Sequence, residues 1–288
     1  MSSDSALADD FCLDAVRRGD RDRYLTVLFA PAGRRPGLLA LYAFNLEIAR
    51  ARESVSEPMI GLIRLQWWRD CLDQIFAGEP VRRHPVAEAL ARAIARHRLP
   101  REPFEWLLLG RERDMEPAPP SDRAALIDYA EATAGPLFEL GARILDCDAA
   151  EHEAARIAMR EIAIGYALTG LLRSIPFHAG AGRVYLPEDA MRHAGLAVQD
   201  LIASASAEKR RALVAEIAAI AASHLDEGRR LGRSAPRRLR SLLLSGAIAR
   251  AHLRRLERAG FDPLHASVQQ SPPWTIWSLM LRSLFGRV

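Results

Sequence analysis

Apolar residues recur three and four positions apart over most of this chain, which is the spacing of one face of an α-helix. The clearest run follows Pro58 and comprises Leu62, Leu65, Trp68, Leu72 and Ile75. Proline is favoured in the first turn of a helix, where its missing N–H has no partner to lose. We therefore predict a helix that begins near Pro58 and turns an apolar stripe toward a core.

The same spacing, interrupted by Pro and Gly, predicts seven further helices. They cover residues 36–53, 85–96, 102–115, 122–145, 151–174, 207–230 and 237–259. Runs of β-branched residues between turn residues are almost absent. We predict an all-α fold in one domain, residues 1–288, with a partly flexible N-terminus over residues 1–20. Long helices with short connections form bundles, whose interior can hold a ligand between facing helices.

The composition supports a large helical core and limits the classes of partner that the protein could bind. Of the 288 residues, 49% are hydrophobic, which is enough for a large core. The formal net charge is +4, yet the arginines are spread through the predicted helices rather than gathered in a tail. This pattern fits weak attraction to an anionic membrane or ligand and argues against nucleic-acid binding. Lys209 is the single lysine, a bias typical of a GC-rich bacterial genome.

The cysteines and the absence of long apolar runs indicate where in the cell the protein is expected. Cys12, Cys71 and Cys147 are far apart and form no CxxC pair, so neither a disulfide framework nor a zinc site is expected. The acidic start MSSDSALADDF has no signal-peptide pattern, and no run of 18 apolar residues occurs. We expect a cytoplasmic protein, with peripheral attachment to the inner membrane left open.

The last segment, residues 272–288, is predicted to form an amphipathic helix. Trp274, Trp277, Leu281 and Leu284 recur at helical spacing. Tryptophans and arginines suit a bilayer interface, but the same face could pack on the bundle. Both alternatives stay open. Trp67, Trp68 and Trp106, in contrast, are expected in the core rather than in an aromatic cage.

Two motifs carry a family resemblance. LFAPAGRRPGLLALYAF at residues 28–44 and RVYLPEDAMRHAG at residues 183–195 resemble the opening and the second signature of the squalene/phytoene synthase family. Segments at 64–73, 84–90, 99–108 and 256–264 match in the expected order. The resemblance implies a single-domain bundle of the isoprenoid-synthase type with a central cavity. That family condenses prenyl diphosphates, and two aspartate-rich helical segments hold the Mg²⁺ that neutralises the leaving group.

The aspartates of those segments have no counterpart at the matching positions of this chain. In the first segment the positions are occupied by Ala49, Arg50 and Glu53. Counting back from the second motif without a gap puts Ala167, Gly170 and Arg173 where the family has Gln, Asn and Arg, and puts Ser174 and His178 at its two aspartates. We therefore expect neither metal nor cofactor. A relocated metal site at Asp10 and Asp14, or at Asp70 and Asp73, is the less favoured alternative.

No catalytic residue is assigned, but the resemblance places a set of side chains around the cavity. These expected ligand-binding residues are Tyr42, Arg50, Glu53, Arg173, His178, Arg183 and Tyr185. Arginines grip phosphate without a metal, so a basic pocket for a phosphorylated or carboxylated lipid is one hypothesis. The alternative is that these residues bind no ligand. In that case the arginines pair with acidic neighbours or solvent, and His178 is a loop histidine bonded to backbone.

The stretch LLRSIPFHAGAGRVYLPED, residues 171–189, resembles a divergent branch of the family that includes the mitochondrial complex I assembly factor. This resemblance implies a non-catalytic assembly factor at the inner membrane, with respiratory-complex subunits as partners. Two alternatives stay open. One is a transferase that condenses farnesyl or geranylgeranyl diphosphate. The other is a protein that binds an isoprenoid, lipid or prenyl phosphate without metal. Whether the chain is an enzyme is undecided, with a non-catalytic role favoured.

Overall fold

The computed structural model describes residues 3–53, 57–146 and 152–270, and no β-strand occurs among them. The prediction of an all-α fold is confirmed. Contacts divide the chain into two compact units that are interleaved in sequence. The first unit comprises residues 1–116, 136–156 and 235–242, and the second comprises residues 117–135, 157–234 and 243–288. The predicted C-terminal helix, 272–288, lies outside the described residues.

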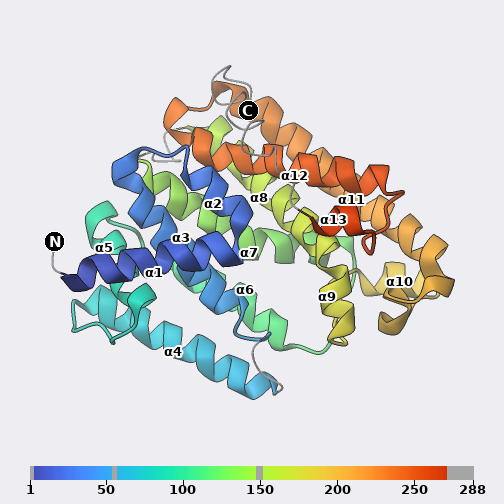
Figure 1. The fold of residues 1–288 in the computed structure, drawn as a ribbon, viewed down its shortest axis with the longest axis horizontal. Helices are drawn as coiled ribbons and strands as arrows, with labels where there is room; N and C mark the ends of the chain where they lie inside the picture. Colours follow the sequence, from blue (N-terminus) through green and yellow to red (C-terminus); the bar gives the residue numbers. More distant parts are fainter. Residues whose placement is uncertain (1–2, 54–56, 147–151, 271–288) are drawn as a thin grey trace. The chain divides into compact units, whose positions relative to one another are not determined.

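The first unit is built from the N-terminal helices (Figure 1). They are α1 (Ser3–Gly19), α2 (Arg21–Val27), α3 (Arg35–Ala49), α4 (Pro58–Ala77), α5 (Pro85–His97) and α6 (Glu102–Glu112). Helix α1 occupies the segment predicted to be partly flexible, and it packs against α3 and α5. An ion pair between Asp9 and Arg92, 2.5 Å long, joins α1 to α5.

Helix α3 supplies the centre of this unit because its apolar residues point to several sides. Eleven of its fifteen residues are buried. Phe44 meets Trp68 of α4 edge to face at 5.2 Å between ring centroids, and meets Phe104 of α6 at 5.7 Å. Such aromatic contacts add to the free energy gained from apolar burial. They hold α3, α4 and α6 together in one core.

Local signals set the helix ends of α4. Pro58 occupies the first turn, as predicted, and Gly78 ends the helix in the left-handed conformation with φ of 71°. Glycine adopts that conformation without the steric cost that a Cβ would bring. The helix therefore starts and stops where the sequence signals it.

The second unit contains α8 (Glu153–Arg173) for most of its length and the helices that follow. These are α9 (Ile175–Gly180), α10 (Glu188–Ala194), α11 (Ala207–Leu231), α12 (Arg240–Arg258) and α13 (Ala266–Gln269). Helix α7 (Arg123–Ile144) begins in this unit and ends in the first. Its Glu131 binds Arg160 of α8 at 2.6 Å, which ties the two helices together.

Glycines bring α8, α11 and α12 unusually close. A Cβ on Gly228 of α11 would lie 2.6 Å from Cγ1 of Ile162, and a Cβ on Gly246 of α12 would lie 3.3 Å from the same side chain. A Cβ on Gly165 of α8 would lie 2.6 Å from Cγ of Leu225. Close approach of backbones is a reason for glycine inside a helix, where it otherwise costs stability.

Candidate functional site

The expected ligand-binding residues fall into both units, with Tyr42, Arg50 and Glu53 in the first. Tyr42 on α3 is buried, and the guanidinium of Arg23 lies 5.6 Å from its ring centroid. Burial is the largest influence and raises the pKa of the Tyr42 phenol to about 12. The phenol is therefore neutral at physiological pH and is held in the core of its unit.

Arg50 and Glu53 lie at the end of α3, where the family resemblance expects aspartates. Arg50 caps the helix, and its backbone N–H donates to the carbonyl of Leu46 over 3.0 Å. Its side chain reaches α1, since a Cβ on Gly19 would lie 2.6 Å from Nη2 of Arg50. Glu53 is exposed in the following turn. The first segment thus ends in an arginine whose side chain packs against α1.

The second segment ends α8 with another arginine. Nη1 of Arg173 lies 3.2 Å from Nε2 of His252 on α12, and the Arg173 carbonyl accepts a hydrogen bond from Nε2 of Gln269 over 3.0 Å. A guanidinium can donate but not accept, so the imidazole nitrogen is the acceptor. A guanidinium beside an imidazole attracts anions and repels a magnesium ion.

His178, Arg183 and Tyr185 are brought together in the second unit. His178 was expected on a loop, but Pro176 starts a short helix, α9, that contains it. Its ring centroid lies 4.7 Å from that of Tyr185, which in turn lies 5.4 Å from Tyr129 of α7. The backbone N–H of Arg183 donates to the His178 carbonyl over 2.9 Å. The structure therefore brings these three of the expected ligand-binding residues together.

The space beside this cluster is small. Its lining includes Leu171, Ile175 and Leu201 together with His178 and Arg183, and its volume is about 10 Å³. A hollow of that size has room for one water at most. Nη1 of Arg183 is buried and has no hydrogen-bond partner among the residues that the structure describes. A buried donor without an acceptor costs about 1–3 kcal/mol.

Acidic residues elsewhere in the first unit are engaged with arginines. Asp14 pairs with Arg17 at 2.8 Å, Asp70 with Arg82 at 3.3 Å, and Asp73 with Arg101. Taking each unit separately, we find no group of three or more His, Cys, Asp or Glu side chains placed to hold a metal ion among its described residues.

His252 and Gln269 are site residues that the sequence did not suggest. They follow Arg173 by 79 and 96 residues, and no local spacing links them to it. Residues so far apart in sequence come into contact only when the helices pack together, so no sequence pattern indicates this contact.

Within the described part of the chain, no helix is both long enough and apolar enough to cross a bilayer.

Comparison with known proteins adds a second line of argument. A sequence model of the family "Squalene/phytoene synthase" matches residues 16–278. The chain is 31% identical over 277 residues to "NADH dehydrogenase (ubiquinone) complex I, assembly factor 6" of Bos taurus, which covers 96% of the chain and 81% of the relative. It is 26% identical over 207 residues to "Phytoene synthase 1, chloroplastic" of Arabidopsis thaliana, and the match covers 71% of this chain and 49% of the synthase.

Solved structures agree with the sequence matches. The squalene synthase HpnC from Alicyclobacillus acidocaldarius aligns with a TM-score of 0.75 at 25% identity, covering 92% of this chain and 98% of that one. Its arrangement of helices is thus shared over almost the full length of both proteins.

Proposed function

Because this chain belongs to the squalene/phytoene synthase family and resembles its assembly-factor members over most of its length, we propose that it is a non-catalytic assembly factor for a respiratory NADH dehydrogenase complex, complex I. The bovine relative that carries this name shares 31% identity across 96% of the chain. The similarity to the plant phytoene synthase is lower and shorter. We place the protein in the cytoplasm, in contact with the inner membrane where such a complex is built.

The observation that carries the non-catalytic part of the proposal is that Ser174 and His178 stand where the family resemblance expects the second pair of aspartates. Prenyl transfer in this family needs carboxylates to hold Mg²⁺ at the diphosphate. Neither a serine nor a histidine at these positions supplies a carboxylate for a divalent cation. Since each 1.36 kcal/mol of lost transition-state stabilisation slows a reaction about tenfold, the loss of metal binding would make ordinary turnover negligible.

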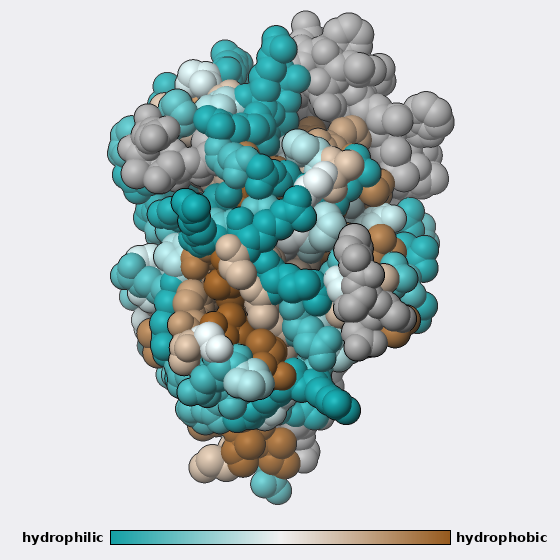
Figure 2. All heavy atoms as spheres, turned by 90° about the vertical axis from the view of Figure 1, so that its left-hand side faces the viewer, coloured by the Kyte–Doolittle hydropathy of each residue, from teal (hydrophilic) through white to brown (hydrophobic). Residues whose placement is uncertain are grey.

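A protein-binding role is supported by the surface of the first unit. Met59, Ile60 and Ile63 in the first turns of α4 are exposed, as are Trp106 and Leu109 of α6. Figure 2, where the side bearing α1, α4 and α5 faces the viewer, shows hydrophobic side chains gathered among hydrophilic ones. Large exposed apolar groups rimmed by polar residues are typical of interaction sites.

The proposal is tested by affinity purification of the tagged protein from its host, followed by identification of the retained subunits. We expect subunits or assembly intermediates of the NADH dehydrogenase complex, and we expect a deletion strain to accumulate less of the assembled complex on native gels. A deletion strain with normal amounts of assembled, active complex would rule the role out.

A second candidate function is metal-independent binding of a prenyl phosphate or lipid, which membership of the squalene/phytoene synthase family favours. The hollow of about 10 Å³ beside Arg183 would have to widen to admit such a ligand. Calorimetric titration with farnesyl diphosphate, with and without Mg²⁺, separates the possibilities. Binding of equal strength in both conditions supports the second function. Magnesium-dependent binding with release of pyrophosphate would restore a transferase and overturn the non-catalytic proposal.

A further inference from the structure

A cavity of about 370 Å³ opens among α8, α11 and α12 in the second unit. None of its lining residues belongs to the cluster around His178. Ile162, Leu225 and Leu243 form an apolar floor, and all three are buried. Gly246 also lines the cavity, and a Cβ there would lie 3.3 Å from the Ile162 side chain. The volume falls within the range of small-molecule sites, about 300–1,000 Å³.

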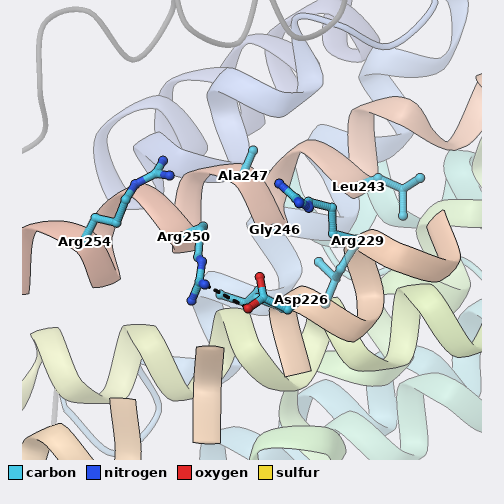
Figure 3. A pocket seen from close by; sticks show the side chains of 9 residues that line it. Asp226, Arg229, Leu243, Gly246, Ala247, Arg250 and Arg254 are labelled. Atoms are coloured by element: carbon cyan, nitrogen blue, oxygen red, sulfur yellow. Dashed lines mark hydrogen bonds and ion pairs between the residues drawn. The ribbon is translucent and has the colours of Figure 1, made fainter. Parts of the chain in front are cut away.

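The rim of this cavity is basic. Arg229 comes from α11, while Arg250 and Arg254 come from α12, and Figure 3 shows the three side chains around one opening. The Asp226 carboxylate accepts a hydrogen bond from Nη2 of Arg250 over 2.8 Å. The lining residues therefore include three guanidinium groups and one carboxylate.

Two arginines of the rim lie one turn apart on α12. Arg250 and Arg254 are four residues apart on α12, so they share one helix face, where like charges disfavour the helix. Arg229 makes no hydrogen bond or ion pair with any residue that the structure describes. Its place in the last turn of α11 suits the helix dipole, whereas Arg250 of α12 is paired with Asp226.

We propose that this cavity binds the phosphate headgroup of an anionic lipid. Arg229 and Arg254 donate to the phosphate oxygens, because the planar guanidinium matches two oxygens of a phosphate at once. Arg250 stays paired with Asp226 and adds charge, and the apolar floor receives the first carbons of the lipid. Sites for nucleic acid combine such charge with aromatic stacking, and the residues lining this cavity include no aromatic ring. The inference does not depend on an assembly role.

Calorimetric titration with monomeric dihexanoyl phosphatidic acid tests the proposal. We expect saturable binding of one lipid per chain. The double variant Arg229→Gln/Arg254→Gln removes two charge-assisted contacts and keeps the Asp226–Arg250 pair, so it should weaken binding at least about tenfold. Ala247→Phe places a ring in the cavity and should weaken the lipid in the same way.

The matched control is Arg230→Gln/Arg258→Gln, which removes the same charge from α11 and α12 at exposed positions outside the cavity. It should bind the lipid like the original protein. Circular dichroism melts establish that all variants fold. Equal weakening in both double variants would reveal a diffuse basic surface and overturn the proposal. Inorganic phosphate that binds as tightly as the lipid, with no effect of Ala247→Phe, would overturn the lipid assignment in favour of free phosphate.

Discussion

Arg210 on α11 is buried, and its Nη2 lies 3.3 Å from Oδ1 of Asp262, a residue that follows α12. Nη1 of Arg210 donates to the carbonyl of Ala203 over 2.8 Å. Asp262 also accepts from Arg211 at 2.9 Å and from the backbone N–H of Leu264 at 3.1 Å. One carboxylate therefore balances a buried guanidinium and fixes the chain after α12 against α11.

Removing that carboxylate should destabilise the second unit. Asp262→Asn leaves the buried guanidinium of Arg210 without a counter-charge, and breaking a buried pair from one side costs about 3–5 kcal/mol. We expect a loss near the lower end, about 3 kcal/mol, because the amide oxygen of asparagine can still accept. Urea unfolding followed by circular dichroism measures this loss of unfolding free energy. Glu227→Gln breaks the exposed pair with Arg230 and should change little; equal effects of both variants would contradict the prediction.

The same carboxylate makes stability depend on pH. Burial raises the pKa of Asp262, but hydrogen bonds from Arg211 and Leu264 and the charge of Arg210 outweigh burial and place it below the ordinary 3.8. A pKa that is lower in the folded state gives stability that is complete above the unfolded value and lost as pH falls through the folded value. The difference in unfolding free energy between the original protein and Asp262→Asn should be constant at neutral pH and shrink below about pH 4. If the difference in unfolding free energy between the two proteins stayed constant down to the pH of acid unfolding, the predicted role of the Asp262 carboxylate would be wrong.

Two glycines of α8 should respond to alanine in opposite directions. At Gly165 a Cβ would meet Leu225 at 2.6 Å and the carbonyl oxygen of Ala221 at 2.9 Å, so Gly165→Ala should cost about 1–3 kcal/mol. At Gly170 no atom of the described residues other than the backbone of α8 itself lies within 4 Å of the added Cβ, so Gly170→Ala should stabilise by about 0.5–1 kcal/mol. Thermal unfolding of the two variants compares them directly. The same sign for both would show that α8 does not pack as described.

Cys12 and Cys71 should be unreactive in the folded protein. Both side chains are buried, and burial is the largest influence that raises the pKa of Cys12 to about 12 and that of Cys71 to about 11. The thiolate is the reactive form, so alkylation at about pH 8 should be negligible before unfolding and complete in denaturant. Peptide mass spectrometry after iodoacetamide treatment assigns each site. Rapid labelling of either residue in the native protein would refute the packing of its helix.

The exposed start of α4 should matter for partners rather than for folding. Ile60→Asp/Ile63→Asp places two carboxylates on this apolar surface, and we expect loss of the co-purifying respiratory subunits with little change in melting temperature. Ile202→Asp changes an isoleucine of similar exposure in the second unit and should retain them. Retention of partners by both variants would remove α4 from the proposed interface.

The long helices could be predicted because their signals are local. The buried stripe of α4 contains Leu65, Trp68 and Leu72 as expected, but it continues to Gly61 rather than Leu62, which is 37% exposed. Gly61 packs under Met115, so a residue without a side chain occupies the core position. Trp106 is 47% exposed although a core position was predicted, because hydrophobicity alone does not show which helix face has a neighbour.

The segment around the second motif was harder to predict. Helices α9 and α10 are short and flanked by Pro and Gly, so a loop was expected over residues 178–189. The cluster of His178 with Tyr185 follows from family resemblance, whereas the contact of Arg173 with His252 depends on α8 and α12 packing together. The basic cavity beside Ile162 had no signal in the sequence because its residues come from three helices.

The interleaving of the two units has a consequence for synthesis of the chain. The first unit needs residues 235–242, where Leu242 packs within 2.9 Å of the position of a Cβ on Gly141. A ribosome that has just finished residue 116 must therefore add more than a hundred further residues before that unit can close. At about 5–20 residues per second this delay is several seconds to some tens of seconds. During that interval the apolar residues of α7 around Gly141 lack their neighbour Leu242, and exposed apolar surface of this kind is what holding chaperones bind.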